Sequence, residues 1–412
     1  MPTKRGWAAI AAGLSLWIAA RLLGSADLHI LASGVLVLPL IAALYVRWSR
    51  VRLGIRRHIS PARVFAGGRA VIELTVENLG RATTSFLLLE DAMPITLGRP
   101  ARLVVSGVPS RNAQSVSYSI VCRQRGRYHI GPLTIFVSDP FGLARTRLQT
   151  AGSNDLVVYP QVEDLDARPM LSQGVGSGES AVRHLHRTAA DFYTMREYVT
   201  GDDLRRIHWP SVAKTSQLMI RQDESTRRSS ATVFIDNRLE TLGASGSPSF
   251  ERAVSVAGSV GRTLIRAGYN LRLATADSQP TLLNEEGMLE ALASLGPART
   301  LGTTNVLRAL RAGALADTTL TYVSAPPSPG DVATISRVGS LFGRKLGIFV
   351  YPTGPRNLSG DAAEEVTARA SAATVSLQRA GWEVHVLPPE GRLSDTWKQQ
   401  NAKRRAAVGS SS

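Results

Sequence analysis

The segment from Arg196 to Glu224 holds the densest group of chemically capable side chains in the sequence. It reads REYVTGDDLRRIHWPSVAKTSQLMIRQDE, and its first fourteen residues include two adjacent aspartates, two adjacent arginines, a histidine and a tryptophan. Carboxylates and histidine can bind metals or transfer protons. One hypothesis is therefore a hydrolase-like enzyme that uses Asp202, Asp203 and His208.

The spacing within this segment argues against that chemistry. His208 follows Asp203 by five residues and Asp202 by six, whereas two ligands on one helix face are three or four residues apart. Thr200 and Asp203 are typical of a helix start, and Pro210 is expected to end that helix.

A structural or partner-binding segment explains the same residues. The two aspartates would lie in the first helical turn, where the dipole favours them, and could pair with Arg205 and Arg206. Trp209 would then be the apolar anchor of a recognition surface, so we expect this segment to be non-catalytic.

A second polar group follows the strand that we expect at 231–236. In an open parallel sheet, ligands bind at the carboxyl ends of the strands, and Asp236 lies at such an end. The von Willebrand factor A fold carries the pattern Asp-x-Ser-x-Ser here, which holds Mg²⁺ through oxygen ligands. This chain has Arg238 and Glu240 in place of the serines, and Ser324 where an acidic ligand is usual. We therefore expect a degenerate site with no metal and no cofactor.

The elements that position this site are predicted by hydrophobic periodicity. Strand patterns alternate with helix patterns from residue 230 to 395, which predicts a doubly wound α/β domain with a parallel sheet covered on both faces. The expected strands span 231–236, 269–276, 319–325, 345–352 and 382–388, and the expected helices span 249–268, 285–296 and 361–380. A basic disordered tail is expected at 396–412.

Residues 51–160 show a different pattern. Apolar and polar residues alternate with period two in short runs at 70–78, 115–122 and 133–139, with glycine, asparagine and proline turns between them. Such spacing is typical of an all-β sandwich. The following stretch, 161–229, is expected to contain a linker rich in Gly, Ser, Arg and His at 164–190 and then the segment described first.

Two apolar runs occupy the N-terminal 50 residues. They span Trp7–Leu23 and Leu28–Val46, and each is long enough to cross about 30 Å of hydrocarbon. Only four residues separate them, so they predict a transmembrane hairpin. Lys and Arg flank both outer ends, which by the positive-inside rule places the rest of the chain in the cytoplasm. A cleaved signal peptide ending near residues 24–26 and a pair of buried core helices are the alternatives.

The basic charge does not indicate nucleic-acid binding. The net charge is +16, but residues 1–60 alone hold eight Lys/Arg against one acid. Residues 61–396 are close to balance, with 36 basic and 31 acidic side chains, and a DNA-binding face would need a broad excess there. The single cysteine, Cys122, cannot form an internal disulfide, which fits a reducing compartment.

The segment 196–224 closely resembles the signature of the bacterial family called domain of unknown function 58 (DUF58). The matching residues are Arg196, Tyr198, Gly201, Asp202, Arg205, Ile207, Trp209, Ala213, Lys214, Leu218 and Arg221. The run RGRYHIGPLTIFVSDPFGLAR at 125–145 resembles the second motif of the family. The resemblance implies two membrane spans, a β-sandwich, the signature and a von Willebrand A-like domain.

The same resemblance implies a membrane-anchored adaptor in the bacterial cell membrane. Its partners would be a MoxR-type AAA+ ATPase and a transglutaminase-like membrane protein, and its role would be the assembly or maturation of other proteins. The signature residues would then bind the partner. Besides the hydrolase, a binder of anionic lipids or cell-envelope precursors, using the juxtamembrane arginines, remains an alternative.

Overall fold

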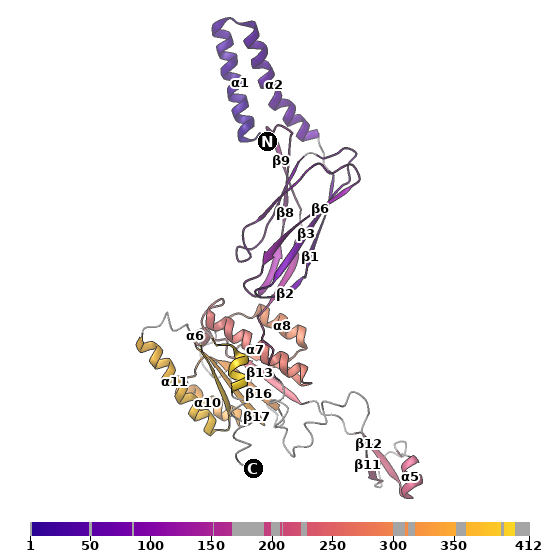
Figure 1. Ribbon diagram of the computed structural model, residues 1–412, viewed down its shortest axis with the longest axis vertical. Coiled ribbons are helices and arrows are strands. Elements are labelled where there is room, and N and C mark those ends of the chain that lie inside the picture. Colours follow the sequence, from indigo (N-terminus) through magenta and orange to yellow (C-terminus); the bar gives the residue numbers. More distant parts are fainter. Residues whose placement is uncertain are drawn as a thin grey trace. The chain divides into compact units, whose positions relative to one another are not determined.

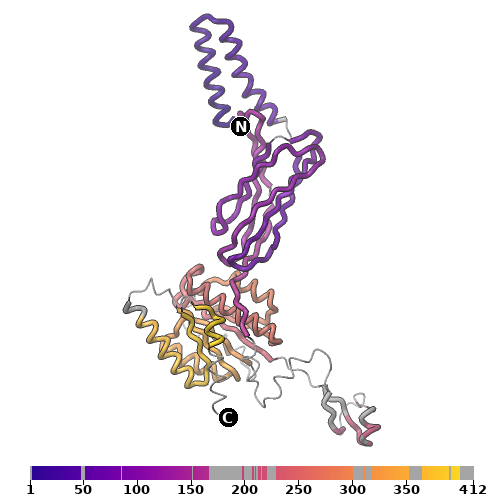
Figure 2. Tube along the Cα trace, viewed as in Figure 1, coloured from indigo at the N-terminus to yellow at the C-terminus, as the bar shows by residue number. Residues whose placement is uncertain are grey.

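The computed structural model describes residues 2–48, 52–84, 86–150, 152–166, 193–198, 207, 209–223, 229–299, 310–311, 318–351, 360–388 and 391–399. The chain divides into two compact units. The first comprises Met1–Gln161 with Leu289–Leu295, and the second comprises Val162–Met288 with Gly296–Ser412. Figures 1 and 2 show the elements of each unit, coloured along the chain.

Two long apolar helices begin the first unit, as expected. They are α1 (Lys4–Leu23) and α2 (Ala26–Trp48). Thr3 caps α1 at its start, and Gly24 ends it in the left-handed conformation with φ 63°. Gly24 is suited to this position because it has no Cβ to clash there. Both helices are long and apolar enough to cross a membrane, and most of their side chains are exposed to the surroundings. This agrees with the predicted hairpin.

The rest of the first unit is mostly β, which confirms the expected strand content. Its ten strands form three sheets. The first sheet has the order β1 (Leu53–Ser60), β3 (Arg69–Asn78), β6 (Ala113–Val121). The second sheet has the order β2 (Arg63–Phe65), β10 (Asn154–Tyr159), β7 (Gly126–Ile130). The third sheet has the order β5 (Ala101–Val105), β4 (Leu87–Asp91), β8 (Leu133–Ser138), β9 (Arg145–Gln149). Buried residues from all three sheets belong to a single apolar core.

An ion pair lies inside this β region. The Asp91 carboxylate is fully buried and accepts hydrogen bonds from Arg57 Nε at 3.1 Å and from the Tyr118 hydroxyl at 2.7 Å. Arg57 also donates to the carbonyl of Ile130 at 3.0 Å. Burial, together with the Asp91 carboxylate, raises the pKa of Tyr118. Partners on every side offset the cost of removing these charges from water.

A six-stranded sheet forms the centre of the second unit. Its order is β15 (Thr281–Leu282), β14 (Asn270–Thr275), β13 (Ser230–Ile235), β16 (Thr318–Ser324), β17 (Arg344–Val350), β18 (Glu383–Leu387). Numbered along the chain, this is 3-2-1-4-5-6, a doubly wound order. Five strands are parallel, but β15 pairs antiparallel with β14. The prediction of a wholly parallel sheet was therefore wrong, because a two-residue edge strand is too short to show a periodic pattern.

Helices cover both faces of this sheet. They are α6 (Leu239–Leu242), α7 (Pro248–Arg266), α10 (Pro329–Gly339) and α11 (Gly360–Arg379), and α8 (Glu285–Ser294) follows β15 in the chain. Ala274 belongs to the apolar cluster that includes Ile335 of α10 and Leu377 of α11. Leu271 lies three residues before Ala274 on β14, so its side chain faces the opposite side of the sheet. It packs there against Gly261 of α7, where an added Cβ would lie 3.1 Å from the Leu271 side chain. Side chains alternate along a strand, so α7 and the pair α10–α11 lie on opposite faces.

Residues 396–399, which the sequence assigned to a disordered tail, are ordered. Residues 393–399 are helical, and the Trp397 side chain is buried and stacks on His385 with ring centroids 5.1 Å apart. Trp397 Nε1 also donates to the carbonyl of Asp166 at 3.0 Å. The boundary at 396 was wrong because a single tryptophan gives no periodic signal, although burying it against the domain stabilises this turn of helix. The rest of the tail lies outside the described residues.

Candidate functional site

The strand order places a crevice between β13 and β16. These two strands are neighbours, and the chain leaves them toward opposite sides of the sheet, which opens a gap at their carboxyl ends. Asp236 directly follows β13, and Ser324 ends β16. A cavity of about 510 Å³ lies here, lined by Asp236, Arg238, Glu240, Thr241, Ser324, Ala325, Pro326, Pro327, Ser328, Asp331, Val366 and Arg369. The sequence had identified four of these residues as a degenerate metal site, and the fold brings all four to one cavity.

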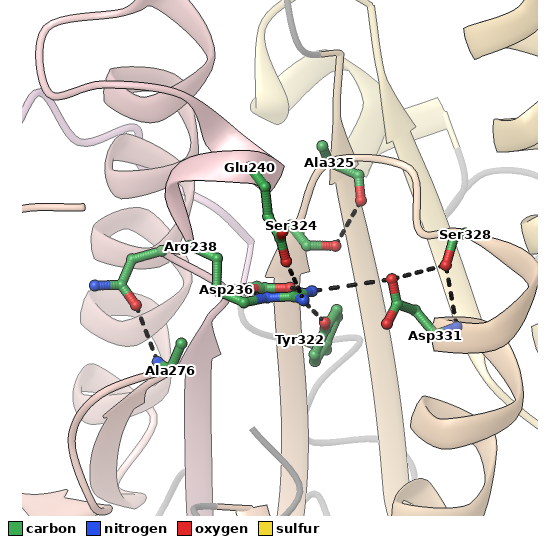
Figure 3. A network of polar contacts seen from close by, with 10 residues as sticks. Asp236, Arg238, Glu240, Ala276, Tyr322, Ser324, Ala325, Ser328 and Asp331 are labelled. Carbon is green, nitrogen blue, oxygen red and sulfur yellow. Dashed lines mark hydrogen bonds and ion pairs between the residues drawn. The ribbon is translucent and has the colours of Figure 1, made fainter. Parts of the chain in front are cut away.

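Arg238 and Asp236 form the centre of this site (Figure 3). Arg238 Nε donates to Asp236 Oδ1 at 2.7 Å, and Nη2 donates to Oδ2 at 2.7 Å. The side chains are only 5% and 1% exposed. A two-point pairing of guanidinium and carboxylate is both strong and geometrically specific. The guanidinium therefore lies directly against the carboxylate that a metal site of this pattern would use.

Two further carboxylates surround the same guanidinium. Glu240 Oε1 accepts from Arg238 Nη1 at 2.8 Å, and Asp331 Oδ2 lies 3.9 Å from Nη2. The hydrogen bond to Asp236 and the nearby negative charges raise the pKa of Arg238, against the effect of burial. Arg238 is thus a fixed cation that three carboxylates share.

Tyr322 completes the polar network from the middle of β16. Its hydroxyl donates to Asp236 Oδ2 at 3.1 Å, and its ring stacks on Phe234 with centroids 5.3 Å apart. Burial, reinforced by the Asp236 charge, raises the pKa of Tyr322 well above its usual range. The hydroxyl is therefore protonated and remains a hydrogen-bond donor at neutral pH.

Asn237 fixes the loop that carries these side chains. Its Oδ1 accepts from the backbone N–H of Ala276 at 2.9 Å, and its Nδ2 donates to the carbonyl of Gly296 at 2.9 Å. Ser324 is turned to the side, where its hydroxyl donates to the carbonyl of Ala325 at 2.7 Å. Ser324 thus interacts with its own loop rather than with Asp236 or Arg238.

Sequence reasoning missed Tyr322 and Asp331. Tyr322 could not be identified from the sequence pattern. Alternation along a buried strand does not show which of its residues have side chains that point toward the crevice. Asp331 follows the Ser328–Pro329 helix start, and Ser328 caps α10 by accepting from the Asp331 N–H at 3.2 Å. That serine–proline start was the signal that could have placed Asp331 near the strand end.

The charged residues of the site differ in exposure. Its cation and its buried carboxylate are held in a fixed pair, and Glu240 is the more exposed of the two other carboxylates, at 48% against 22% for Asp331. Across the described ranges, no group of three or more His, Cys, Asp or Glu side chains could hold a metal ion. The absence of a resident metal or cofactor remains a prediction.

Part of the second unit is formed by the signature segment, whose described elements are called the signature unit below. Strands β11 (Tyr193–Glu197) and β12 (Met219–Asp223) pair antiparallel, and α5 (Trp209–Thr215) lies between them in sequence. The register places Arg196 opposite Ile220 and Met195 opposite Arg221. Just beyond β11, the Tyr198 N–H donates to the carbonyl of Leu218 at 2.8 Å. The two arginines of the signature are thus brought onto neighbouring strands.

Helix α5 differs from the predicted helix. Pro210 is its second residue, where proline is tolerated because the first-turn N–H groups have no intrahelical acceptor. The prediction that Pro210 ends a helix was therefore wrong. Trp209 begins α5 and is 67% exposed, Lys214 is exposed, and Ile207 is half-buried. The remaining candidates, Gly201, Asp202, Asp203, Arg205 and His208, lie outside the described residues.

Comparison with known families identifies this segment. A family model described as "Protein of unknown function DUF58" matches residues 194–314. The chain is similar to this family over these residues, which make up less than half of its length. This region includes β11, α5 and β12 and reaches through Asp236, Arg238 and Glu240, so the signature unit and the polar crevice both fall inside it. The resemblance to DUF58 noted from the sequence is confirmed over these residues.

One curated relative is the uncharacterized protein YeaD of Bacillus subtilis (strain 168). It is 23% identical over 234 residues, which cover 55% of this chain and 56% of YeaD. The chain therefore matches about half the length of that relative. Its description assigns no activity.

Matches among solved structures are local. The CARDB domain of the PF1109 protein from Pyrococcus furiosus, in complex with di-metal ions, covers 26% of this chain and 93% of its own, at 15% identity and TM-score 0.20. The alkylpurine DNA glycosylase AlkC of Pseudomonas fluorescens covers 32% of this chain and 38% of its own, at 16% identity and TM-score 0.19. Similarity at this level indicates nothing about function.

Proposed function

We propose that the protein is a non-catalytic, membrane-tethered adaptor that works with a MoxR-type AAA+ ATPase in assembling or maturing other proteins. The observation that carries the proposal is the two-point pairing of Arg238 with Asp236, both at 2.7 Å, at the crevice where a doubly wound domain binds its ligand. A fixed internal cation suits a recognition site that works without a metal. A transglutaminase-like membrane protein is a further partner that the DUF58 resemblance implies.

The proposal includes a von Willebrand A-like assignment for the α/β unit. It is supported by the strand order 3-2-1-4-5-6 and by an aspartate directly after the first strand. In this reading Arg238 replaces the metal of related domains as the cation of the site, and Glu240 and Asp331 give the crevice a net negative charge. A partner would then be held by charge and shape rather than through Mg²⁺.

The proposed membrane orientation places the β region of the first unit and the whole second unit in the cytoplasm. The basic residues Lys4, Arg5 and Arg47 flank the outer ends of the two helices, and such residues favour the cytoplasmic side. A MoxR-type ATPase needs cytoplasmic ATP, so this orientation and the proposed partner require each other.

The proposed partner surface is the signature unit. Trp209 is a large aromatic side chain, 67% exposed at the start of a helix. Tryptophan is enriched among the few residues that supply most of the binding energy at protein interfaces. Lys214 is exposed on the same helix, and it adds a positive charge that an acidic partner surface would complement.

A pull-down tests this proposal. The full-length protein in detergent is immobilised and exposed to the MoxR-type ATPase of the same organism, with and without ATP and Mg²⁺. We expect the wild type to retain the ATPase and Trp209→Ala to weaken retention by about tenfold or more. Leu282→Ala is the matched control, since Leu282 is also an exposed apolar residue, 62% exposed, outside the signature. Absence of retention by the wild type under every condition would overturn the partner assignment.

A further inference from the structure

A basic cavity lies at the base of the helical hairpin in the first unit. Its volume is about 1080 Å³, and it is lined by the residues that precede and begin α1 together with strands β8 and β9. Four of the lining residues are cationic and none of those described is acidic: Lys4, Arg5, Arg145 and Arg147. The cavity therefore concentrates positive charge on residues that the signature and the crevice do not use.

The N-terminal segment is fixed in place to form one wall. Thr3 donates from its hydroxyl to the carbonyl of Gly142 at 2.6 Å and from its N–H to the carbonyl of Leu143 at 2.8 Å. Pro2 lies antiparallel to Ala144 in an isolated bridge. These contacts hold the start of α1 against the β8–β9 loop, so Lys4 and Arg5 are positioned by backbone contacts to a distant part of the chain.

The β8–β9 loop is itself held by a buried carboxylate. Asp139 accepts hydrogen bonds from the N–H of Phe141 at 2.9 Å and from the N–H of Ala144. Leu143 and Ala144 then pack in a buried cluster with Ala42 and Val46 of α2. The cavity wall is consequently continuous with the end of the second apolar helix.

Lys4, Arg5 and Arg147 leave positive charge in this cavity that a ligand can reach. No described carboxylate lies within ion-pair distance of Lys4, Arg5 or Arg147, and the Arg145 guanidinium lies over the Phe136 ring, 5.2 Å from its centroid. The start of α1 adds the partial positive charge of a helix N-terminus. Arginine side chains bind phosphate oxygens in a two-point geometry, so the chemistry of the cavity fits a phosphate group.

The position of the cavity relative to the apolar helices indicates where that phosphate comes from. Lys4 and Arg5 form the first turn of α1, immediately before its apolar run, and Val46 is in the last turn of α2. A hairpin that crosses the bilayer would place these residues at the depth of the lipid headgroups. Phe141, which is 64% exposed beside the cavity, could enter the same interfacial layer.

We propose that this cavity binds the phosphate of an anionic phospholipid headgroup. The site is distinct from the proposed adaptor surface, because it lies in the first unit and uses none of the signature residues. It gives the base of the hairpin a defined lipid contact, beyond the general attraction of basic residues to an anionic membrane.

Lipid titration followed by native mass spectrometry tests the proposal. The full-length protein in a non-ionic detergent is titrated with phosphatidylglycerol, phosphatidylcholine and soluble glycerol phosphate. We expect the wild type to bind phosphatidylglycerol more tightly than phosphatidylcholine, and Arg145→Gln with Arg147→Gln to weaken phosphatidylglycerol binding by about tenfold or more. Lys4→Gln with Arg5→Gln removes the same charge from the opposite wall and is expected to act in the same direction.

Matched variants distinguish specific lipid binding in this cavity from non-specific attraction of basic residues to an anionic lipid. Arg69→Gln with Arg123→Gln removes two exposed arginines of the same β region that do not line the cavity, and it should change binding less than twofold. Arg145→Lys with Arg147→Lys keeps the charge and should retain most of the affinity. Equal losses in the cavity and control pairs, or no loss in either, would overturn the proposal. Displacement of the lipid by equimolar glycerol phosphate would overturn the assignment to a lipid.

Discussion

Arg238 and Asp236, two residues apart in sequence, share two hydrogen bonds of 2.7 Å at the carboxyl end of β13. The pair lies in the crevice between β13 and β16, in the place where a domain of this topology presents its ligand site. Tyr322 contacts the pair from the neighbouring strand β16, and Asn237 links the loop of the pair to Ala276 at the end of β14. The site is therefore preorganised around a cation supplied by the protein itself.

Removing the Arg238 charge should destabilise the α/β unit. Arg238→Ala leaves the buried Asp236 carboxylate with Tyr322 as its remaining side-chain donor, and breaking a buried pair on one side costs about 3–5 kcal/mol. Glu240→Gln is the control, because that carboxylate is 48% exposed and its loss should cost less than about 1 kcal/mol. Urea unfolding followed by fluorescence of the buried Trp382 measures both. Equal costs for the two variants would contradict a central role for the pair.

Restoring the serine pattern should create a Mg²⁺ site. Arg238→Ser with Glu240→Ser removes the guanidinium and produces Asp-x-Ser-x-Ser at 236–240. A ligand that binds only the folded state at ten times its Kd adds about 1.4 kcal/mol. We expect MgCl₂ to raise the Tm of this variant by about 2–4 °C and to leave that of the wild type unchanged.

The matched control for this experiment also carries Asp236→Asn. That change removes the charged oxygen donor and should abolish the Mg²⁺ effect on Tm. A Tm shift of equal size in the wild-type protein would show that Arg238 does not exclude the metal.

Stability should fall at alkaline pH because of Tyr322. Burial and the Asp236 charge raise its pKa above the usual value of 10.0 in the folded state. The stabilising contribution is thus complete below pH 10 and is lost as the pH rises, by about 1.4 kcal/mol per pH unit for one such group. Tyr322→Phe should flatten this decline above pH 10, at a cost of about 1–2 kcal/mol at neutral pH for the lost hydrogen bond. An unchanged alkaline slope in this variant, measured by urea unfolding from pH 8 to 11, would assign the decline to other groups.

Asp91→Asn should lower the stability of the β region far more than Glu90→Gln at the preceding position. Asp91 is fully buried with Arg57 and Tyr118, so removing its charge should cost about 3–5 kcal/mol. Glu90→Gln affects a partly exposed pair with Arg102 at 3.0 Å and should cost less than about 1 kcal/mol. Hydrogen exchange of β1 and β4 peptides measures the difference. Similar protection in the two variants would be inconsistent with a buried pair that stabilises this region.

Local sequence patterns determined the order and type of most elements. The two apolar runs, the period-two alternation at 70–78 and the helical stripe of 249–268 predicted α1, α2, β3 and α7 within a few residues. These elements are determined by neighbouring residues and by the spacing of the apolar side chains that are buried away from water. Both can be read directly from the sequence. The DUF58 signature is likewise a local run of residue types.

Tertiary structure alone decided which distant residues meet. Tyr322 contacts Asp236 only because β16 lies beside β13, and Asp331 pairs with Arg238 only because α10 begins at the same edge. Strand β15 forms by pairing with β14 at the edge of the sheet. Arg145 and Arg147 line the same cavity as Lys4 and Arg5 because the β8–β9 loop pairs with the N-terminal segment. Such contacts join residues tens to hundreds of positions apart. Their formation depends on how the whole chain packs, and no short window of sequence encodes that.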